Sequence, residues 1–170
     1  MRRLSDYIGK ELLIFQKSIW KRDFELRSGE ELIARMFYPK FFSDLTELSV
    51  WEETYEFYRP KFFSRDVDIR KKGYQNPFAN FKNNFWGSKG VLELPRGVKL
   101  NMKFGLFRKP AEIYLGENDL VITMLSRFSI KEKGEIIIEK RSDILDEHPW
   151  IIMLAFYLAQ LRKRNSAAGS

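Results

Sequence analysis

The sequence predicts a mainly β protein, a closed antiparallel barrel of about twelve strands around a hydrophobic C-terminal central helix. Two observations lead to this fold class. Up to about residue 141 the chain consists of short runs in which apolar and polar residues alternate, separated by turn residues. It then ends in a continuous apolar segment, residues 150–161, in which Gln160 is the only polar residue. Aromatic residues make up 15% of the chain, as expected where many strands face a thick core.

Glycine and proline turns divide the first part of the chain into strands of ordinary length. The clearest hairpin has Pro95-Arg96-Gly97 as its turn, and its second strand is apolar on one side and polar on the other. Residues 48–58 alternate as a single strand, except that Glu53 falls on the apolar face. Because almost all connections are short, neighbouring strands are expected to be antiparallel. The predicted strands are residues 12–15, 23–27, 31–38, 48–58, 66–70, 78–82, 91–94, 98–104, 111–115, 120–126, 129–133 and 135–141.

The helix is predicted over residues 147–164. Ser142 or Asp143, and again Asp146, are suitable N-caps, and the cations of residues 162–164 suit a helix C-terminus. The apolar stretch is shorter than the ~20 residues of a membrane span, and charges border it on both sides. A helix on one face of an open sheet would keep a polar stripe. A barrel of more than eight strands has room for a helix about 10 Å across, so an enclosed helix fits the sequence best.

The domain is expected to span residues 1–164, with residues 165–170 as a disordered tail because nothing in them can pack. Residues 1–10 are short and mixed, and they predict one helical turn or a frayed end. The chain has no cysteine, which excludes disulfides and thiolate metal sites and suits a reducing cytoplasm. Its first residues hold a basic pair without the apolar core of a secretory signal. We therefore expect a cytoplasmic location.

Four segments and the apolar helix follow one another in an order that is similar to a known family. From about residue 17 to residue 164 this order resembles the tubby-like superfamily, which takes in tubby proteins, phospholipid scramblases and LURP-one-related proteins. The set is most similar to bacterial single-domain members of the group. The segments are Phe24-Glu25-Leu26-Arg27-Ser28-Gly29-Glu30, Tyr55-Glu56-Phe57-Tyr58-Arg59-Pro60-Lys61-Phe62, residues 66–70, and Asn84-Phe85-Trp86-Gly87 preceding residues 91–94.

The resemblance implies a twelve-stranded barrel with the hydrophobic helix along its axis. It also implies a role at membranes, because tubby domains bind phosphoinositide headgroups through basic side chains and scramblases act at membranes with calcium. No local motif transfers those functional residues to this chain. Only Asp143, Asp146 and Glu147 are similar to the acidic calcium segment of scramblases.

The net charge of +7 favours an anionic partner, although such a charge also simply keeps a protein in solution. Our leading hypothesis is a non-enzymatic module that binds anionic phospholipid or phosphoinositide headgroups, or docks a protein partner, at the inner face of the membrane. The alternative is a structural or protein-interaction barrel with no lipid role, in which the cations are solvated turn residues. The predicted anion-binding residues are Lys61, Arg65, Arg70, Lys71, Lys72, Lys99, Lys103, Arg108 and Lys109.

Other chemistries find little support. His148 lies beside Asp146 and Glu147 and just after Asp143, a set that suits a metal or acid–base catalysis but also an acid-capped helix start. We expect the second, and hence no metal, no cofactor and no enzyme, since nucleophile and nucleotide motifs are missing too. The glycines of residues 86–90 predict a barrel turn rather than a phosphate loop, because a strand follows them. Phe85-Trp86 between Lys82 and Lys89 is the one hint of nucleic-acid binding, and we expect those aromatics to be buried instead.

Overall fold

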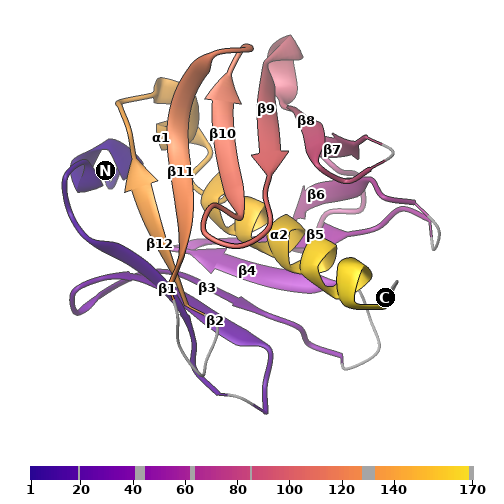
Figure 1. Cartoon of the computed structure of the whole chain (residues 1–170), viewed down its shortest axis with the longest axis horizontal. Helices are drawn as coiled ribbons and strands as arrows, with labels where there is room; N and C mark the ends of the chain where they lie inside the picture. Colours follow the sequence, from indigo (N-terminus) through magenta and orange to yellow (C-terminus); the bar gives the residue numbers. More distant parts are fainter. Residues whose placement is uncertain (19, 41–44, 62–63, 85, 128–132, 169–170) are drawn as a thin grey trace.

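Twelve antiparallel strands form a closed barrel in the computed structural model, which describes residues 1–18, 20–40, 45–61, 64–84, 86–127 and 133–168 (Figure 1). Each strand pairs with its neighbours in sequence, and β1 pairs with β12 to close the ring. The predicted barrel of about twelve antiparallel strands is therefore confirmed. The strands are β1 (Leu12–Gln16), β2 (Asp23–Ser28), β3 (Glu31–Phe37), β4 (Thr46–Val50), β5 (Glu53–Tyr58), β6 (Val67–Lys71), β7 (Ala79–Asn83), β8 (Lys89–Glu93), β9 (Lys99–Phe104), β10 (Ala111–Leu115), β11 (Asp119–Arg127) and β12 (Lys133–Ile138).

The prediction of one strand over residues 48–58 is wrong, because this segment is a hairpin of β4 and β5. Val50 pairs with Glu53, so Trp51 and Glu52 alone make the turn, with Trp51 at φ 49°. The buried positions switch from even numbers in β4 (Leu48, Val50) to odd numbers in β5 (Tyr55, Phe57), but the turn contains neither glycine nor asparagine to mark it. The misplaced Glu53 was the visible sign of the turn. Of the predicted strand at 129–133, all but Lys133 lies outside the described residues.

Two helices follow the last strand where one was predicted. Helix α1 (Asp143–Glu147) is capped by Ser142, whose hydroxyl accepts a hydrogen bond from the Leu145 amide at 3.4 Å, which confirms one predicted cap. His148 leaves the helical region at φ −126° and ψ 62°, as expected of a residue before proline. Helix α2 (Ile151–Ala168) therefore starts later than residue 147.

Helix α2 also extends beyond its predicted end. The segment 165–168 is helical rather than a disordered tail, because its serine and alanines do not interrupt a helix, whereas the first glycine of this region is residue 169. Among the described residues, no helix is both long enough and apolar enough to cross a bilayer.

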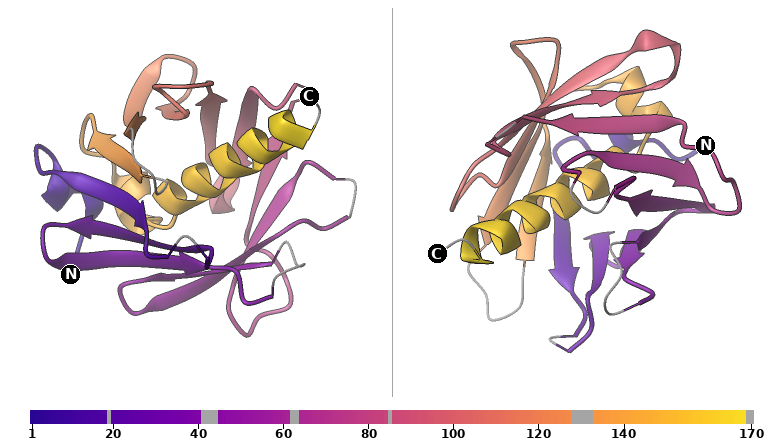
Figure 2. Two further views of the ribbon diagram at one scale, coloured as in Figure 1. Left: turned by 60° about the horizontal axis from the view of Figure 1, so that its bottom comes forward. Right: turned by 90° about the vertical axis from the view of Figure 1, so that its right-hand side faces the viewer.

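The start of α2 is buried on every face. All nine residues from Trp150 to Leu158 are at most 6% exposed. The Phe156 ring meets Phe24 of β2 edge-on at 5.0 Å, and the Tyr157 ring lies 5.7 Å from Phe57 of β5. Strand β10 also contacts the helix, so strands far apart in the ring pack against the same helix (Figure 2). An all-apolar segment requires such burial, since it has no polar face to turn to water.

The N-terminal residues form a 3-10 helix, η1 (Leu4–Tyr7), with Leu4 fully buried. The Ser5 amide donates a hydrogen bond to the Asp146 carboxylate at 2.8 Å, which ties η1 to α1. The expectation of one helical turn is met, and the turn is fixed by a contact that sequence spacing did not show.

Candidate functional site

The barrel has two chemically different ends. Because consecutive strands are antiparallel neighbours, connections after odd-numbered strands gather at one end and those after even-numbered strands at the other. We call the first the Arg162 end, since Arg162 of α2 donates a hydrogen bond to the carbonyl of Phe104, the last residue of β9. We call the second the His148 end, where α2 begins and the ring of Trp150 lies 5.5 Å from Phe78, in the connection between β6 and β7.

Cations gather at the Arg162 end. Among the described residues, its connections and the last turns of α2 hold twelve cations but only one acid, Asp66. The connections and N-terminal residues at the His148 end hold seven cations and nine acids. An anionic partner would therefore be attracted to the Arg162 end. Its cations are Lys17, Lys21, Arg22, Lys40, Arg59, Lys61, Arg65, Arg108, Lys109, Arg162, Lys163 and Arg164.

The structure separates the nine predicted anion-binding residues into two groups. Four lie in loops at the Arg162 end: Lys61, Arg65, Arg108 and Lys109. Lys103 lies near that end of β9, with its Nζ 4.5 Å from the centre of the Tyr114 ring.

The other four lie toward the His148 end, and each makes an ion pair with a glutamate. Two of the ion pairs are short, Lys72 Nζ to Glu47 at 2.6 Å and Lys71 Nζ to Glu53 at 2.9 Å. The remaining two predicted residues, Arg70 and Lys99, pair with Glu56 and Glu93 at 3.4 Å and 3.9 Å. The nine residues thus do not form a single patch, and these four have glutamates as partners.

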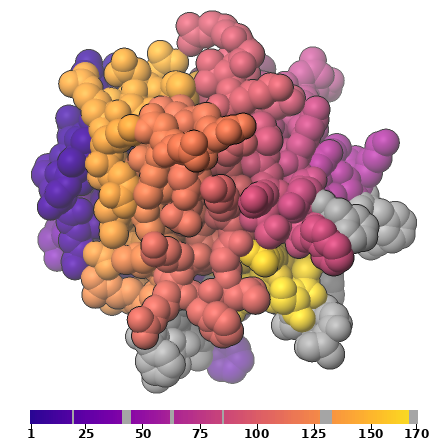
Figure 3. Space-filling model, turned by 45° about the horizontal axis from the view of Figure 1, so that its top comes forward, coloured from indigo at the N-terminus to yellow at the C-terminus, as the bar shows by residue number. Residues whose placement is uncertain are grey.

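A cavity of about 250 Å³ opens at the Arg162 end, lined by three arginines, Arg59, Arg65 and Arg162. They come from the end of β5, the start of β6 and the last turns of α2, so only the closed barrel brings them together. Trp86 also lines this cavity. In Figure 3 the yellow C-terminal part of the chain reaches the surface beside pink and red segments, in agreement with this arrangement.

Two lysines directly opposite each other lie on the outer barrel face next to this end. Lys89 of β8 and Lys103 of β9 are register partners, and both line a second cavity of about 600 Å³. Like charges directly opposite on neighbouring strands repel each other. A bound anion between them would remove that repulsion.

Large apolar side chains are exposed at the same end. Trp20, Trp86, Leu106 and Phe107 are exposed by 87%, 79%, 55% and 89%, and all lie in connections after odd-numbered strands. Phe107 also adopts φ 77°, a conformation that is unfavourable for a bulky residue. No burial of its ring compensates for that strain. The expected burial of the aromatics beside Lys82 and Lys89 is wrong for Trp86, while Phe85 lies outside the described residues.

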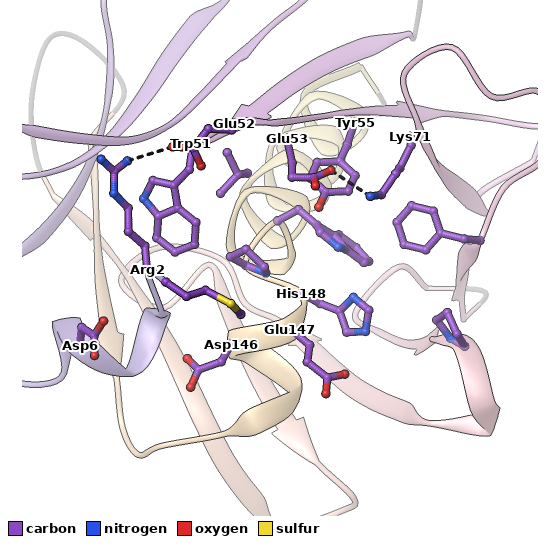
Figure 4. A pocket seen from close by; sticks show the side chains of 16 residues that line it. Arg2, Asp6, Trp51, Glu52, Glu53, Tyr55, Lys71, Asp146, Glu147 and His148 are labelled. Atoms are coloured by element: carbon purple, nitrogen blue, oxygen red, sulfur yellow. Dashed lines mark ion pairs between the residues drawn. The ribbon is translucent and has the colours of Figure 1, made fainter.

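A larger cavity, of about 820 Å³, lies at the His148 end (Figure 4). Its walls include Trp51, Tyr55 and His148, whose side chains come from the β4–β5 turn, β5 and the α1–α2 connection. Burial, together with the nearby Arg96, holds the pKa of His148 below its ordinary 6.5, against the opposing effect of Glu147. The imidazole is therefore mostly neutral at pH 7.

The acids beside His148 do not form a metal site. Asp146 accepts its hydrogen bonds from Ser5, and Glu147 pairs with Arg96 at 3.1 Å. Within the described part of the chain, no three His, Asp or Glu side chains are grouped so that they would hold a metal ion.

Backbone amides of the glycine loop before β8 donate hydrogen bonds within the loop itself. The side-chain oxygen of Asn84 accepts hydrogen bonds from the amides of Ser88 and Lys89, at 3.0 and 3.3 Å. These two amides are thus occupied within the turn, which favours a structural turn over a phosphate loop.

Comparisons of the chain with protein-family models, with curated proteins and with solved structures found no match. The tubby-like resemblance therefore remains a prediction from the sequence.

Sequence reasoning missed Arg59, Arg162 and Lys89, and it missed the exposed apolar residues of the Arg162 end. Counting whether each connection follows an odd- or an even-numbered strand was the signal that could have placed these residues at one end of the barrel. Treating residues 48–58 as one strand hides one reversal of the chain, so the loops that follow are assigned to the wrong end.

Proposed function

We propose that this protein is a non-enzymatic module that docks on membranes, with the Arg162 end as its lipid-binding surface. The observation that carries the proposal is the coincidence of exposed apolar side chains and cations in the same loops. Trp20 directly precedes Lys21 and Arg22, and Leu106 and Phe107 directly precede Arg108. Anionic phospholipid or phosphoinositide headgroups are the ligands that such a surface suits best.

Each component of this surface has a separate physical role. A cation near an anionic leaflet contributes roughly 1 kcal/mol to binding, and the effect declines within a Debye length. Exposed aromatic and aliphatic side chains enter the headgroup boundary and add apolar burial. Either component alone is weak, whereas together they favour stable peripheral attachment.

The C-terminal half of α2 supports the same surface, because it carries Arg162, Lys163 and Arg164 in succession. We infer further that α2 lies along the axis of the barrel, as the tubby-like resemblance implies. Burial of all nine residues from Trp150 to Leu158, and their contacts with separate strands, support this position. A helix held this way would place Arg162 rigidly beside Arg59 and Arg65.

Vesicle co-sedimentation tests the proposal through a matched pair of charge reversals. Arg108→Glu/Lys109→Glu changes the Arg162 end, and Lys71→Glu/Lys72→Glu makes the same change of charge at the other end. At ~0.1 M salt we expect the first variant to bind phosphatidylserine or phosphoinositide vesicles at least about 30-fold more weakly than the unmodified protein. We expect the second variant to bind nearly as well. No preference of the unmodified protein for anionic over neutral vesicles would refute the proposal.

Phe107 gives an independent test because stability and binding should change in opposite directions. Asparagine tolerates a positive φ better than phenylalanine, so Phe107→Asn should leave the melting temperature unchanged or raise it. The same substitution should weaken vesicle binding, since an inserting ring is lost. Tyr74→Asn removes an exposed aromatic residue, 67% exposed, from the His148 end and serves as the control. Equal vesicle binding by both variants would contradict insertion at the Arg162 end.

The protein-interaction alternative makes a different prediction. If the basic and apolar loops contact a protein partner instead, the unmodified protein will bind anionic and neutral vesicles equally poorly. Arg108→Glu/Lys109→Glu will then still abolish localisation at the membrane in cells, because the partner supplies the attachment.

A further inference from the structure

Three arginines line the cavity of about 250 Å³ at the Arg162 end, and among the described residues no carboxylate lines it. Arg59 directly follows β5, Arg65 lies just before β6, and Arg162 belongs to α2. Arg65 is exposed and the other two are half-buried, so a ligand from solvent can reach all three. Three positive charges around one small cavity repel one another, and an anion between them would replace that repulsion with attraction.

Arg162 is held by the barrel and still has donors to offer. Its Nη1 donates a hydrogen bond to the carbonyl of Phe104 at the end of β9, which fixes the guanidinium in the cavity wall. A guanidinium carries five N–H donors in a rigid fork, so the remaining N–H groups can bind a ligand. Arginine matches phosphate oxygens especially well, because two of its N–H groups donate in parallel.

The other lining residues suit a small polar group in partly apolar surroundings. Phe104, Leu158 and Leu161 form an uncharged part of the lining. Apolar neighbours lower the local dielectric constant, which strengthens the attraction between a guanidinium and an anion. Asn165 and Ser166 add neutral polar side chains that can also donate, and they line the cavity because α2 continues past residue 164.

The acid nearest in sequence leaves the cavity to an external anion. Asp66 follows Arg65, but its carboxylate accepts a hydrogen bond from the backbone amide of Asn83 at 3.4 Å. Asp66 is not one of the residues that line the cavity. The described lining therefore holds no carboxylate of the protein's own between the arginines.

The size of the cavity and its three arginines indicate which anion fits. Drug-sized ligands occupy clefts of about 300 Å³ and more, so a cavity of about 250 Å³ suits one small group and not a whole lipid. A phosphomonoester presents three terminal oxygens and a charge of about −1.5 to −2 at pH 7. A phosphodiester or a carboxylate presents two such oxygens and a single negative charge. Three guanidinium groups therefore match a phosphomonoester best.

We propose that this cavity binds a phosphomonoester group, held by Arg59, Arg65 and Arg162 together. The inference rests on the proposed function only where the source is a lipid, and there it names the headgroup that the Arg162 end selects. The same group also occurs on free phosphorylated solutes such as glycerol 3-phosphate. From either source, the bound anion would join the loops beside β5 and β6 to the C-terminal half of α2.

Calorimetric titration of the full-length protein with two matched soluble probes tests the site. Glycerol 3-phosphate is a phosphomonoester, and glycerophosphoglycerol is the corresponding diester. At pH 7.5 and ~0.1 M salt we expect glycerol 3-phosphate to bind saturably and at least about tenfold more tightly than the diester. No saturable heat from glycerol 3-phosphate, or equal affinity for both probes, would overturn the proposal.

Substitutions of Arg65 separate a specific site from general charge. Arg65 is exposed, so Arg65→Gln should keep a cooperative melt, while the loss of a charge-assisted hydrogen bond should weaken the binding of glycerol 3-phosphate about tenfold. Arg65→Lys keeps the charge without the fork and should still bind at least about threefold more weakly than the unmodified protein.

A matched control removes the same charge at the other end of the barrel. Arg96 makes an exposed pair with Glu147, and Arg96→Gln should bind glycerol 3-phosphate normally. Equal weakening by Arg65→Gln and Arg96→Gln would show that net charge alone attracts the probe. Full affinity in Arg65→Lys would contradict recognition by the guanidinium fork.

Vesicles distinguish the two sources and keep this inference separate from the proposed function. If the source is a lipid, phosphatidic acid vesicles should bind more tightly than phosphatidylglycerol vesicles of equal surface charge, and glycerol 3-phosphate should compete. If glycerol 3-phosphate binds and neither type of vesicle does, the site takes a free phosphomonoester, and the membrane proposal fails while this one stands. Vesicle binding without any binding of glycerol 3-phosphate would leave the membrane proposal standing and overturn this one.

Discussion

The ring of Phe81 occupies the space beside Gly90. A Cβ placed on Gly90 would lie 2.1 Å from Phe81 Cζ and 2.8 Å from the carbonyl oxygen of Lys82. The two residues lie on the paired strands β7 and β8, and Phe81 is fully buried with its ring 6.0 Å from that of Phe104. Glycine is therefore required here by packing, and not by a positive φ.

Replacing this glycine should destabilise the barrel. Gly90→Ala forces the Phe81 ring out of its position, and we expect a loss of about 1–3 kcal/mol in the free energy of unfolding, measured by urea denaturation. Gly134→Ala is the matched control in β12, because its added Cβ would have nothing closer than 3.5 Å. In the Gly90→Ala/Phe81→Leu double variant, part of the loss caused by Gly90→Ala should be relieved. Equal losses in the two single alanine variants would contradict this role of Phe81.

Helix α2 should be necessary for folding. A chain that ends at Asp146 lacks the segment from Trp150 to Leu158, whose buried side chains fill a space far larger than a single-residue cavity. We expect no cooperative thermal transition from this truncation by circular dichroism. A chain that ends at Arg164 keeps all of those residues and should melt nearly normally. A cooperative melt of the shorter chain would show that the strands close without the helix.

Glu25 should contribute more than its surface position on β2 suggests. Its carboxylate is nearly buried, 2.7 Å from Arg27 Nε and 3.1 Å from Lys17 Nζ. Burial alone would raise the pKa of Glu25, but hydrogen bonds from Arg27 and Lys17 hold it below its ordinary 4.5. Glu25→Gln should therefore cost about 1–3 kcal/mol at pH 7.

The pH dependence of this loss follows from the sign of the shift. Since the folded pKa is lowered, the stabilisation is complete above about pH 5 and disappears as the pH falls through the folded pKa. The difference between the unmodified protein and Glu25→Gln should therefore shrink in acid. Glu53→Gln makes the same change in the exposed pair with Lys71 and should cost less than about 1 kcal/mol. Chemical denaturation at pH 7 and in acid checks both statements.

His148 should make the protein less stable in mild acid. Its folded pKa lies below the ordinary 6.5, chiefly because burial disfavours the charged imidazolium. Between those two values the unfolded chain binds more protons, so stability falls as the pH drops below about 6.5. His148→Gln removes this titration. As the pH is lowered from 7.5 to 5, the melting temperature of this variant should therefore rise relative to that of the unmodified protein. A constant difference across that range would contradict the assignment.

Much of the fold could be predicted because its signals are local. Alternation of apolar and polar residues identified most strands, and the missing polar face of residues 150–161 required an enclosed helix. The reversal at Trp51-Glu52 was missed because the turn carries no residue typical of hairpins, although the buried positions switch from Leu48 and Val50 to Tyr55 and Phe57 across it. That single reversal decides which loops share an end of the barrel.

The candidate sites were harder to predict than the fold. Lys61, Arg65, Arg108 and Lys109 were identified as cations at turns, but turn chemistry is the same at both ends of a barrel. Nothing local distinguishes Lys72, paired with Glu47 twenty-five residues away, from an unpaired lysine at another turn. The cavity with Trp51 and His148 joins segments almost a hundred residues apart, so no motif marks it.

By itself the sequence determined the fold class, the number of strands within one or two, and the burial of the C-terminal helix, because periodicity and composition act on neighbouring residues. Only the tertiary structure decided which charges are neutralised, which apolar loops meet the cations, and which arginines line the same cavity. The physical reason is that strand pairing and ring closure bring together residues that lie far apart along the chain. Their spacing in the sequence therefore does not reveal that they are in contact.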